Sequence, residues 1–267
     1  MSQNPGQPAG GEVLTSRFST RIHRLTLAGA GPDGAPRTID LLAPVDPDAL
    51  LDDPVVEQRY KADNYLPYWP IVWPSGLMLA NRIVTENTSP PALPRITGQT
   101  SIGDAIGDAT VRERDPIAPP HRVIDLGCGL GTTGIAAGLR GWHVTFTDYD
   151  PEAIEFAAHN ARRNGIPPER IRALHMDWRA PIAETFPWVL ASDVLYERRL
   201  HPLVLAAIEK LLAPGGVAWV SDPQRTSAEN FPLAAVERGF KVSTINMEGE
   251  SFSGGKQAGQ LYVLTRP

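Results

Sequence analysis

The chain has 267 residues, enough for one large α/β domain with a sizeable core and an additional N-terminal segment. Its 42% hydrophobic and 21% charged content is typical of a globular protein, and its net charge of −5 argues against broad binding to a phosphate backbone. We therefore expect no nucleic-acid partner. The single cysteine, Cys128, excludes an internal disulfide and a thiolate metal cluster.

The first residues predict little regular structure. Residues 1–12 are rich in Gly, Pro and Gln, and we expect them to form a disordered tail. They lack the basic and apolar regions of a signal peptide. The apolar runs of the sequence are shorter than the roughly 20 residues that a membrane-spanning helix needs. We expect a cytoplasmic enzyme without a membrane partner.

Residues 13–85 are predicted to form an N-terminal extension. The stretches 22–27 and 38–42 partly alternate apolar and polar residues around a Gly-rich loop, which is typical of a β-hairpin. A polar segment follows, and then a cluster of aromatic residues and prolines at residues 65–74.

A helix and an irregular segment are expected before the main domain. Ser75 is a candidate N-cap for a helix that runs to about Thr85, because apolar residues there recur on one face. Residues 86–120 combine many prolines with Thr, Ser, Gly and Asp, which predicts an irregular insertion or linker.

From residue 121 onward the patterns of strand and helix alternate, which predicts a mostly parallel sheet with helices on both faces. Asp150 is a suitable N-cap for a helix that begins at Pro151, and Gly165 is expected to end it. Strands are predicted at residues 122–124, 143–146, 171–174, 188–190 and 217–220.

The end of the chain departs from this alternation. An apolar stripe over residues 200–212 predicts a helix that stops at Pro214. Residues 241–245 and 260–264 read as strands joined by a loop without a helix, which predicts an antiparallel edge pair. The predicted fold is α/β: a Rossmann-like, doubly wound, mostly parallel seven-stranded sheet with an antiparallel C-terminal edge strand and an N-terminal hairpin and helix.

A glycine-rich turn is the most informative feature of the sequence. A short apolar strand ends in Asp125 and is followed by Gly127, Gly129 and Gly131, which let the backbone adopt positive φ and approach a ligand closely. Asp148 lies 17 residues past Gly131, at the end of the next apolar stretch. In a nucleotide-binding fold this position faces the ribose hydroxyls.

The turn allows two ligand classes. Residues 129–134 match the G-x-G-x-x-G pattern of dinucleotide sites, which would indicate an NAD-dependent oxidoreductase. However, Asp125, Asp148 and Asp177 make the expected pocket acidic, and a pyrophosphate would be repelled there. A sulfonium and an amino group would be attracted, which favours S-adenosyl-L-methionine as the ligand.

The sequence resembles the class I, seven-β-strand S-adenosylmethionine-dependent methyltransferases. Within them it is similar to the lysine methyltransferase group that includes the METTL21-type enzymes and the electron-transfer-flavoprotein β-subunit lysine methyltransferases. The resemblance runs from about residue 60 to the C-terminus, except residues 86–120, and assigns 121–267 to the S-adenosylmethionine-binding domain. It is carried by residues 73–76, 125–131, Asp148, Asp177–Trp178, 192–196 and Asp222–Pro223.

The resemblance implies a set of cofactor contacts. Asp125 would lie near the ammonium group of the cofactor, Asp148 would accept hydrogen bonds from both ribose hydroxyls, and Asp177 would accept from the adenine amino group. The complete set of implied cofactor residues is Trp73, Asp125, Gly127, Cys128, Gly129, Asp148, Tyr149, Asp177, Trp178 and Ser192.

The resemblance also implies catalytic positions. Asp193 and Tyr196 would lie over the transferring methyl group and orient an incoming lysine ammonium. In-line methyl transfer requires mainly alignment, so we expect neither a covalent enzyme intermediate nor a metal. The predicted function is protein-lysine N-methylation of a partner that presents a lysine. The alternatives are N- or O-methylation of a small molecule and, from other classes, NAD-dependent oxidoreduction or a non-catalytic binding module.

Overall fold

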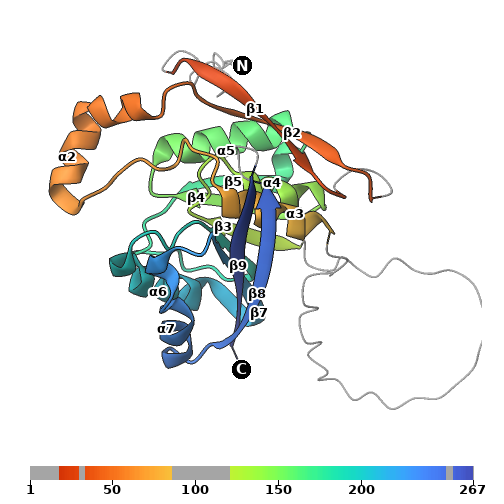
Figure 1. Ribbon diagram of the computed structural model, residues 1–267, viewed down its shortest axis with the longest axis vertical. Helices are drawn as coiled ribbons and strands as arrows, with labels where there is room; N and C mark the ends of the chain where they lie inside the picture. Colours follow the sequence, from red (N-terminus) through yellow and green to blue (C-terminus); the bar gives the residue numbers. More distant parts are fainter. Residues whose placement is uncertain (1–17, 30–33, 86–120, 251–254, 267) are drawn as a thin grey trace, which may run out of the picture.

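The computed structural model describes residues 18–29, 34–85, 121–250 and 255–266 (Figure 1). The predicted tail at 1–12 and the predicted insertion at 86–120 lie outside the described residues. Among the helices of the described parts, none is long and apolar enough to cross a membrane.

A seven-stranded sheet forms the centre of the molecule, with the strand order β5-β4-β3-β6-β7-β9-β8. The strands from β5 to β7 are parallel to one another, and β9 runs antiparallel to both β7 and β8. This arrangement confirms the predicted fold. The strands are β3 (Arg122–Leu126), β4 (His143–Asp148), β5 (Ile171–His175), β6 (Phe186–Ser192), β7 (Leu212–Asp222), β8 (Lys241–Glu250) and β9 (Lys256–Thr265).

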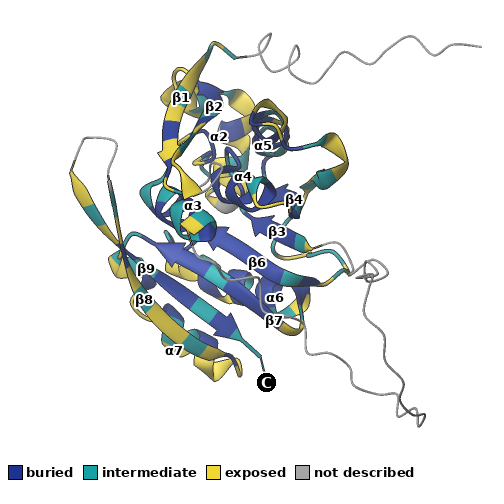
Figure 2. Cartoon of the chain, turned by 90° about the vertical axis from the view of Figure 1, so that its right-hand side faces the viewer, coloured by how far each residue is buried: buried dark blue, intermediate teal, exposed yellow. Residues whose placement is uncertain are grey.

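Helices cover both faces of this sheet, and each face has its own hydrophobic core. Successive residues of a strand point to opposite faces, so Trp188 of β6 packs into one core and Val189 into the other. Figure 2 shows β3, β6 and β7 buried, with β8 largely exposed at the edge. One core lies under α3 (Pro74–Thr85), α4 (Thr132–Leu139) and α5 (Pro151–Arg163), and the other under α6 (His201–Leu211) and α7 (Phe231–Glu237).

The N-terminal hairpin consists of β1 (Thr20–Leu27) and β2 (Arg37–Pro44), which pair antiparallel as predicted. It lies against α5 (Figure 1), where Asn160 accepts from the Leu42 N–H at 2.7 Å and donates to the Leu42 carbonyl at 3.1 Å. One helical turn later, Asn164 makes the same pair of bonds to Asp40. Two side-chain amides therefore replace a neighbouring strand along the edge of β2.

Three local features of the structure go beyond the predictions or differ from them. The segment between the hairpin and the aromatic cluster contains a helix, α2 (Pro54–Asp63), whose N-cap Asp53 accepts from the Val55 N–H at 2.8 Å. Ser75 lies inside α3, and its hydroxyl bonds Asp193 instead of capping the helix.

The third difference concerns the end of α6. This helix stops at Leu211, and β7 runs through Pro214 because Leu212 already pairs with Phe186 of β6 across a bulge. By contrast, Asp150 caps α5 as predicted, accepting from the Glu152 N–H at 3.2 Å. Gly165 follows that helix with a φ of +84°.

Candidate active site

A cavity opens where β3, β4 and β6 end, at the point where the chain turns to opposite sides of β3. Ligands of open α/β sheets bind at such switch points. The space, including its open mouth, amounts to about 1060 Å³. Ten of the twelve residues predicted for the site line it: Trp73, Gly127, Gly129, Asp148, Tyr149, Asp177, Trp178, Ser192, Asp193 and Tyr196.

The glycine turn forms one wall of the cavity. The N–H groups of Gly127 and Cys128 both donate to the Thr147 carbonyl at 2.9 Å, which fastens the turn to β4. Gly127 has a φ of +73°, and a Cβ there would lie 3.1 Å from the Trp178 ring and 3.2 Å from Val194. Only glycine therefore keeps this wall open without strain.

Asp148 lies at one end of the cavity. Its carboxylate accepts from the N–H groups of Gly129 and Asp150, both at 3.0 Å. Burial raises the pKa of Asp148, and these backbone donors oppose the rise. A carboxylate oxygen accepts more than one hydrogen bond, so this group retains acceptor capacity toward the cavity. That capacity suits a ligand with two adjacent hydroxyls.

Aromatic side chains flank this end of the cavity. The Tyr149 ring lies 5.4 Å from the Tyr65 ring, and the Arg179 guanidinium lies 5.6 Å from the Tyr149 centroid. The same Arg179 side chain donates to Asp177 and lowers the pKa of that carboxyl. Asp177 was predicted to accept from an adenine amino group, and in the structure it is also engaged by Arg179.

Asp125 and Cys128 were predicted as cofactor contacts, but they do not line this cavity. The fully buried Asp125 carboxylate accepts from the Thr133 hydroxyl at 2.7 and 2.8 Å and from the Gly134 N–H at 2.8 Å. Burial raises the pKa of Asp125 to about 6. The side chain thus holds the first turn of α4.

This position of Asp125 also bears on the dinucleotide alternative. A pyrophosphate site uses the free N–H groups at a helix N-terminus, and the Gly134 N–H already donates to Asp125. Burial raises the pKa of the Cys128 thiol well above its ordinary value, which keeps it protonated and unreactive.

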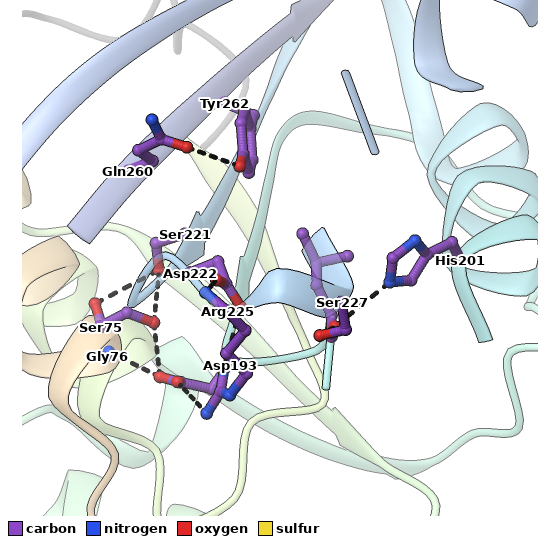
Figure 3. Close-up of polar contacts among 11 residues, drawn as sticks. Ser75, Gly76, Asp193, His201, Ser221, Asp222, Arg225, Ser227, Gln260 and Tyr262 are labelled. Atoms are coloured by element: carbon purple, nitrogen blue, oxygen red, sulfur yellow. Dashed lines mark hydrogen bonds and ion pairs between the residues drawn. The ribbon is translucent and has the colours of Figure 1, made fainter. Parts of the chain in front are cut away.

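Asp193 also lines the cavity and lies just after β6, with a φ of +59°. One carboxylate oxygen accepts from the Ser75 hydroxyl at 2.5 Å and the Gly76 N–H at 3.0 Å, and the other accepts from Arg225 at 2.8 Å (Figure 3). Burial raises the pKa of Asp193 and the Arg225 cation opposes the rise. The predicted acceptor-orienting carboxylate is therefore held by donors of the protein itself.

Three aromatic rings frame the opening beside Asp193. The Tyr196 and Tyr68 rings meet edge to face at 5.1 Å, and the Tyr68 and Trp73 rings do so at 6.1 Å. The Trp73 indole also donates to the Tyr68 carbonyl at 3.0 Å. Tyr68, Tyr65 and Arg225 were not predicted as site residues. The aromatic cluster at 65–74 was the signal for the first two.

The fold and the cavity are those of the class I S-adenosylmethionine-dependent methyltransferases. Residues 70–238, more than half of the chain, match the lysine methyltransferase family, and the chain belongs to that family. S-adenosyl-L-methionine is the methyl donor of its members. Family membership and the use of S-adenosyl-L-methionine by its members both contradict the NAD-dependent alternative.

Similar curated proteins agree with this assignment. The chain is 33% identical over 115 residues to EEF1A lysine methyltransferase 3 of Mus musculus, covering 41% of this chain and 49% of that protein. It is 28% identical to the electron transfer flavoprotein beta subunit lysine methyltransferase of Xenopus laevis, covering 62% and 56%. It is 30% identical to protein N-lysine methyltransferase METTL21A of Danio rerio, covering 48% and 62%. The matched parts thus span about half to three fifths of these relatives.

Proposed function

We propose that this protein transfers a methyl group from S-adenosyl-L-methionine to the ε-amino group of a lysine in a protein substrate. The observation that carries the proposal is a single cavity lined by two chemically different sets of residues, which we call its two ends. One end has the Asp148 carboxylate beside the glycine turn, and the other has the aromatic opening of Tyr68, Trp73 and Tyr196. Membership of the lysine methyltransferase family supports the choice of acceptor.

The first end fits the donor. Asp148 would accept hydrogen bonds from the two ribose hydroxyls, and the backbone of Gly127 and Gly129, which line the cavity, would hold the methionine portion. Trp178 lies beside the same turn and would cover the base. When bound, S-adenosylmethionine supplies a methyl group activated by a sulfonium. The residues of this chain contribute binding, orientation and exclusion of water.

The second end fits the acceptor. The faces of Tyr68, Trp73 and Tyr196 attract an ammonium group by cation–π interaction. A lysine has an ordinary pKa of about 10.4 and must lose its proton before attack, because only the neutral amine is nucleophilic. A dry aromatic lining favours the neutral form. The nitrogen would then form a bond to the methyl carbon while the carbon–sulfur bond breaks, and the extra proton would pass to solvent.

Labelling of a cell extract tests this function. The purified protein is incubated with the extract and tritiated S-adenosylmethionine, and labelled bands are analysed by fluorography and mass spectrometry. We expect a discrete protein band that carries methyl-lysine. Asp148→Ala should abolish the band, whereas the exposed Glu169 on the short helix before β5 provides the control Glu169→Gln. Label confined to small molecules would replace the lysine proposal by small-molecule methylation.

A further inference from the structure

Arg225 occupies the centre of a polar network that joins three separate parts of the chain (Figure 3). It lies in the loop after β7, and its guanidinium donates to Asp222 at 2.9 Å and to Asp193 at 2.8 Å. The same group lies 5.5 Å from the centroid of the Trp73 ring. One side chain thus contacts the end of β7, the end of β6 and the residue that precedes α3.

The loops after β6 and β7 are bound to each other around this arginine. The Ser227 hydroxyl donates to the Leu195 carbonyl at 2.7 Å, and Arg198 donates to the Thr226 carbonyl at 2.9 Å. These bonds span residues 195–198 on one loop and 226–227 on the other. Movement of one loop therefore requires movement of the other.

Backbone strain is concentrated at the same place. Among the described residues, the non-glycine positions with positive φ are Asn64, Asp193 at +59° and Gln224 at +61°. One of them is Asp193 itself, and another is Gln224, the residue next to Arg225. Such conformations persist only where the surroundings fix them, and they gather at sites where geometry matters.

We infer that Arg225 is a positioning residue for the acceptor end of the cavity, and this inference rests on the proposed methyl transfer. It holds Asp193 against the first turn of α3 and packs on Trp73, so that Trp73 stays beside Tyr68 in the aromatic opening. Asp193 consequently acts through its place in this network. Its carboxylate accepts from Ser75, Gly76 and Arg225, so the structure supports a role in holding these elements together.

The chemistry of arginine explains the choice of residue. Its planar guanidinium group donates to two carboxylates in different directions and still presents a flat face to an indole ring. Lysine offers a single compact ammonium that satisfies one of these contacts well. Replacement by methionine keeps much of the length and removes the charge, leaving the buried Asp222 and Asp193 without their shared partner.

The test compares Arg225→Met and Arg225→Lys with the control Arg238→Met, which removes an arginine that pairs with Glu209 and does not line the cavity. Three quantities are measured: S-adenosylhomocysteine affinity by calorimetry, methyl-lysine formation in the extract at saturating cofactor, and hydrogen exchange of the segment 66–79 by mass spectrometry. For Arg225→Met we expect a loss of turnover on the order of 10- to 100-fold, typical of misplaced reacting groups, with cofactor affinity retained. The lysine variant should lie between it and the wild type.

Hydrogen exchange makes the inference independent of activity. We expect faster exchange of residues 66–79 in Arg225→Met and an unchanged rate in the control. Unchanged exchange there, or a loss of turnover matched by an equal loss of cofactor affinity, would overturn the inference. Failure of the wild type to bind S-adenosylhomocysteine would instead reject the proposed function. If Arg225→Met does not fold, Ser75→Ala removes another donor to Asp193 and should show the same pattern with a smaller effect.

Discussion

The hydroxyl of Tyr65 donates a hydrogen bond to the carboxylate of Asp150. This contact joins the segment between α2 and α3 to the N-terminus of α5, across 85 positions of the sequence. It closes one side of the cavity, because Tyr65 lines it next to Tyr149. The Asp150 carboxylate therefore has hydrogen-bond donors in two parts of the chain, because the Glu152 N–H of α5 donates to it as well.

Tyr65→Phe should therefore destabilise the fold. The substitution leaves a mostly buried carboxylate without one of its donors, which costs about 1–3 kcal/mol. Urea denaturation measures the change in the free energy of unfolding. The control is Tyr60→Phe on α2, where the residue is 49% exposed. Equal losses in both variants would show that the bond to Asp150 contributes nothing specific.

The stability of the protein should depend on pH through Asp150. Burial raises the pKa of Asp150 from 3.8 to about 7. The folded state then binds a proton that the unfolded state has released, so the free energy of unfolding falls as the pH rises from about 4 to about 7. Asp150→Asn keeps a good N-cap residue and should flatten this part of the profile.

Denaturation midpoints at about pH 4.5 and about pH 7.5 test this dependence. Relative to the wild type, Asp150→Asn should gain more stability at the higher pH than at the lower one. The matched control is Asp53→Asn at the N-cap of α2, which measures the effect of the same exchange on helix capping. A profile as steep as that of the wild type would assign the pH dependence to other groups.

Asp148 and Asp193 should have separable effects. Asp148→Ala removes acceptors from a ribose diol and should weaken S-adenosylhomocysteine binding by about 1.5–3 kcal/mol, because one partner of each bond is charged. Asp193→Asn keeps the size of the side chain and tolerates positive φ, so cofactor affinity should persist while turnover at saturating cofactor falls. Calorimetry and labelling kinetics distinguish the two. Equal losses of affinity with turnover intact would contradict this division.

Gly127→Ala should lower cofactor affinity in addition to straining the backbone. Alanine at positive φ costs about 1–2 kcal/mol, and here its methyl group would also press on Trp178 at 3.1 Å. The control is Gly239→Ala, where φ is +87° and no atom lies within 4 Å of the added Cβ. Both variants should lose stability, but only Gly127→Ala should lose cofactor affinity. Parallel losses would show that conformational strain alone accounts for the effect.

Much of the fold was predictable because it follows from short-range patterns. The alternation of strand and helix, the glycine turn after Asp125 and the cap at Asp150 each depend on residues close in sequence. The helix α2 was missed although Asp53 and Pro54 form a regular helix start, because its polar sequence shows no apolar face. Its exposed Tyr60 reflects the same lack of a buried stripe.

The predicted site was less accurate where side-chain direction decides the role. Asp125 ends a strand, as a ligand-binding acid would, but its carboxylate accepts hydrogen bonds from the hydroxyl of Thr133 in the next helix. Asp193 is engaged by Ser75 and Arg225, which lie 118 and 32 positions away in sequence. Contacts of that separation depend on how strands are ordered in the sheet, and a local pattern does not encode them.

The position of α3 has a consequence for how the chain can be divided. Leu79 and Ile83 of this helix are buried in the same core as β3 and α4, and Arg140 donates to the Ile83 carbonyl at 2.8 Å. A chain expressed as two polypeptides, broken between Thr85 and His121, should therefore reassemble into one particle. The active cavity would return only on mixing, since its aromatic opening and its glycine turn would come from different halves.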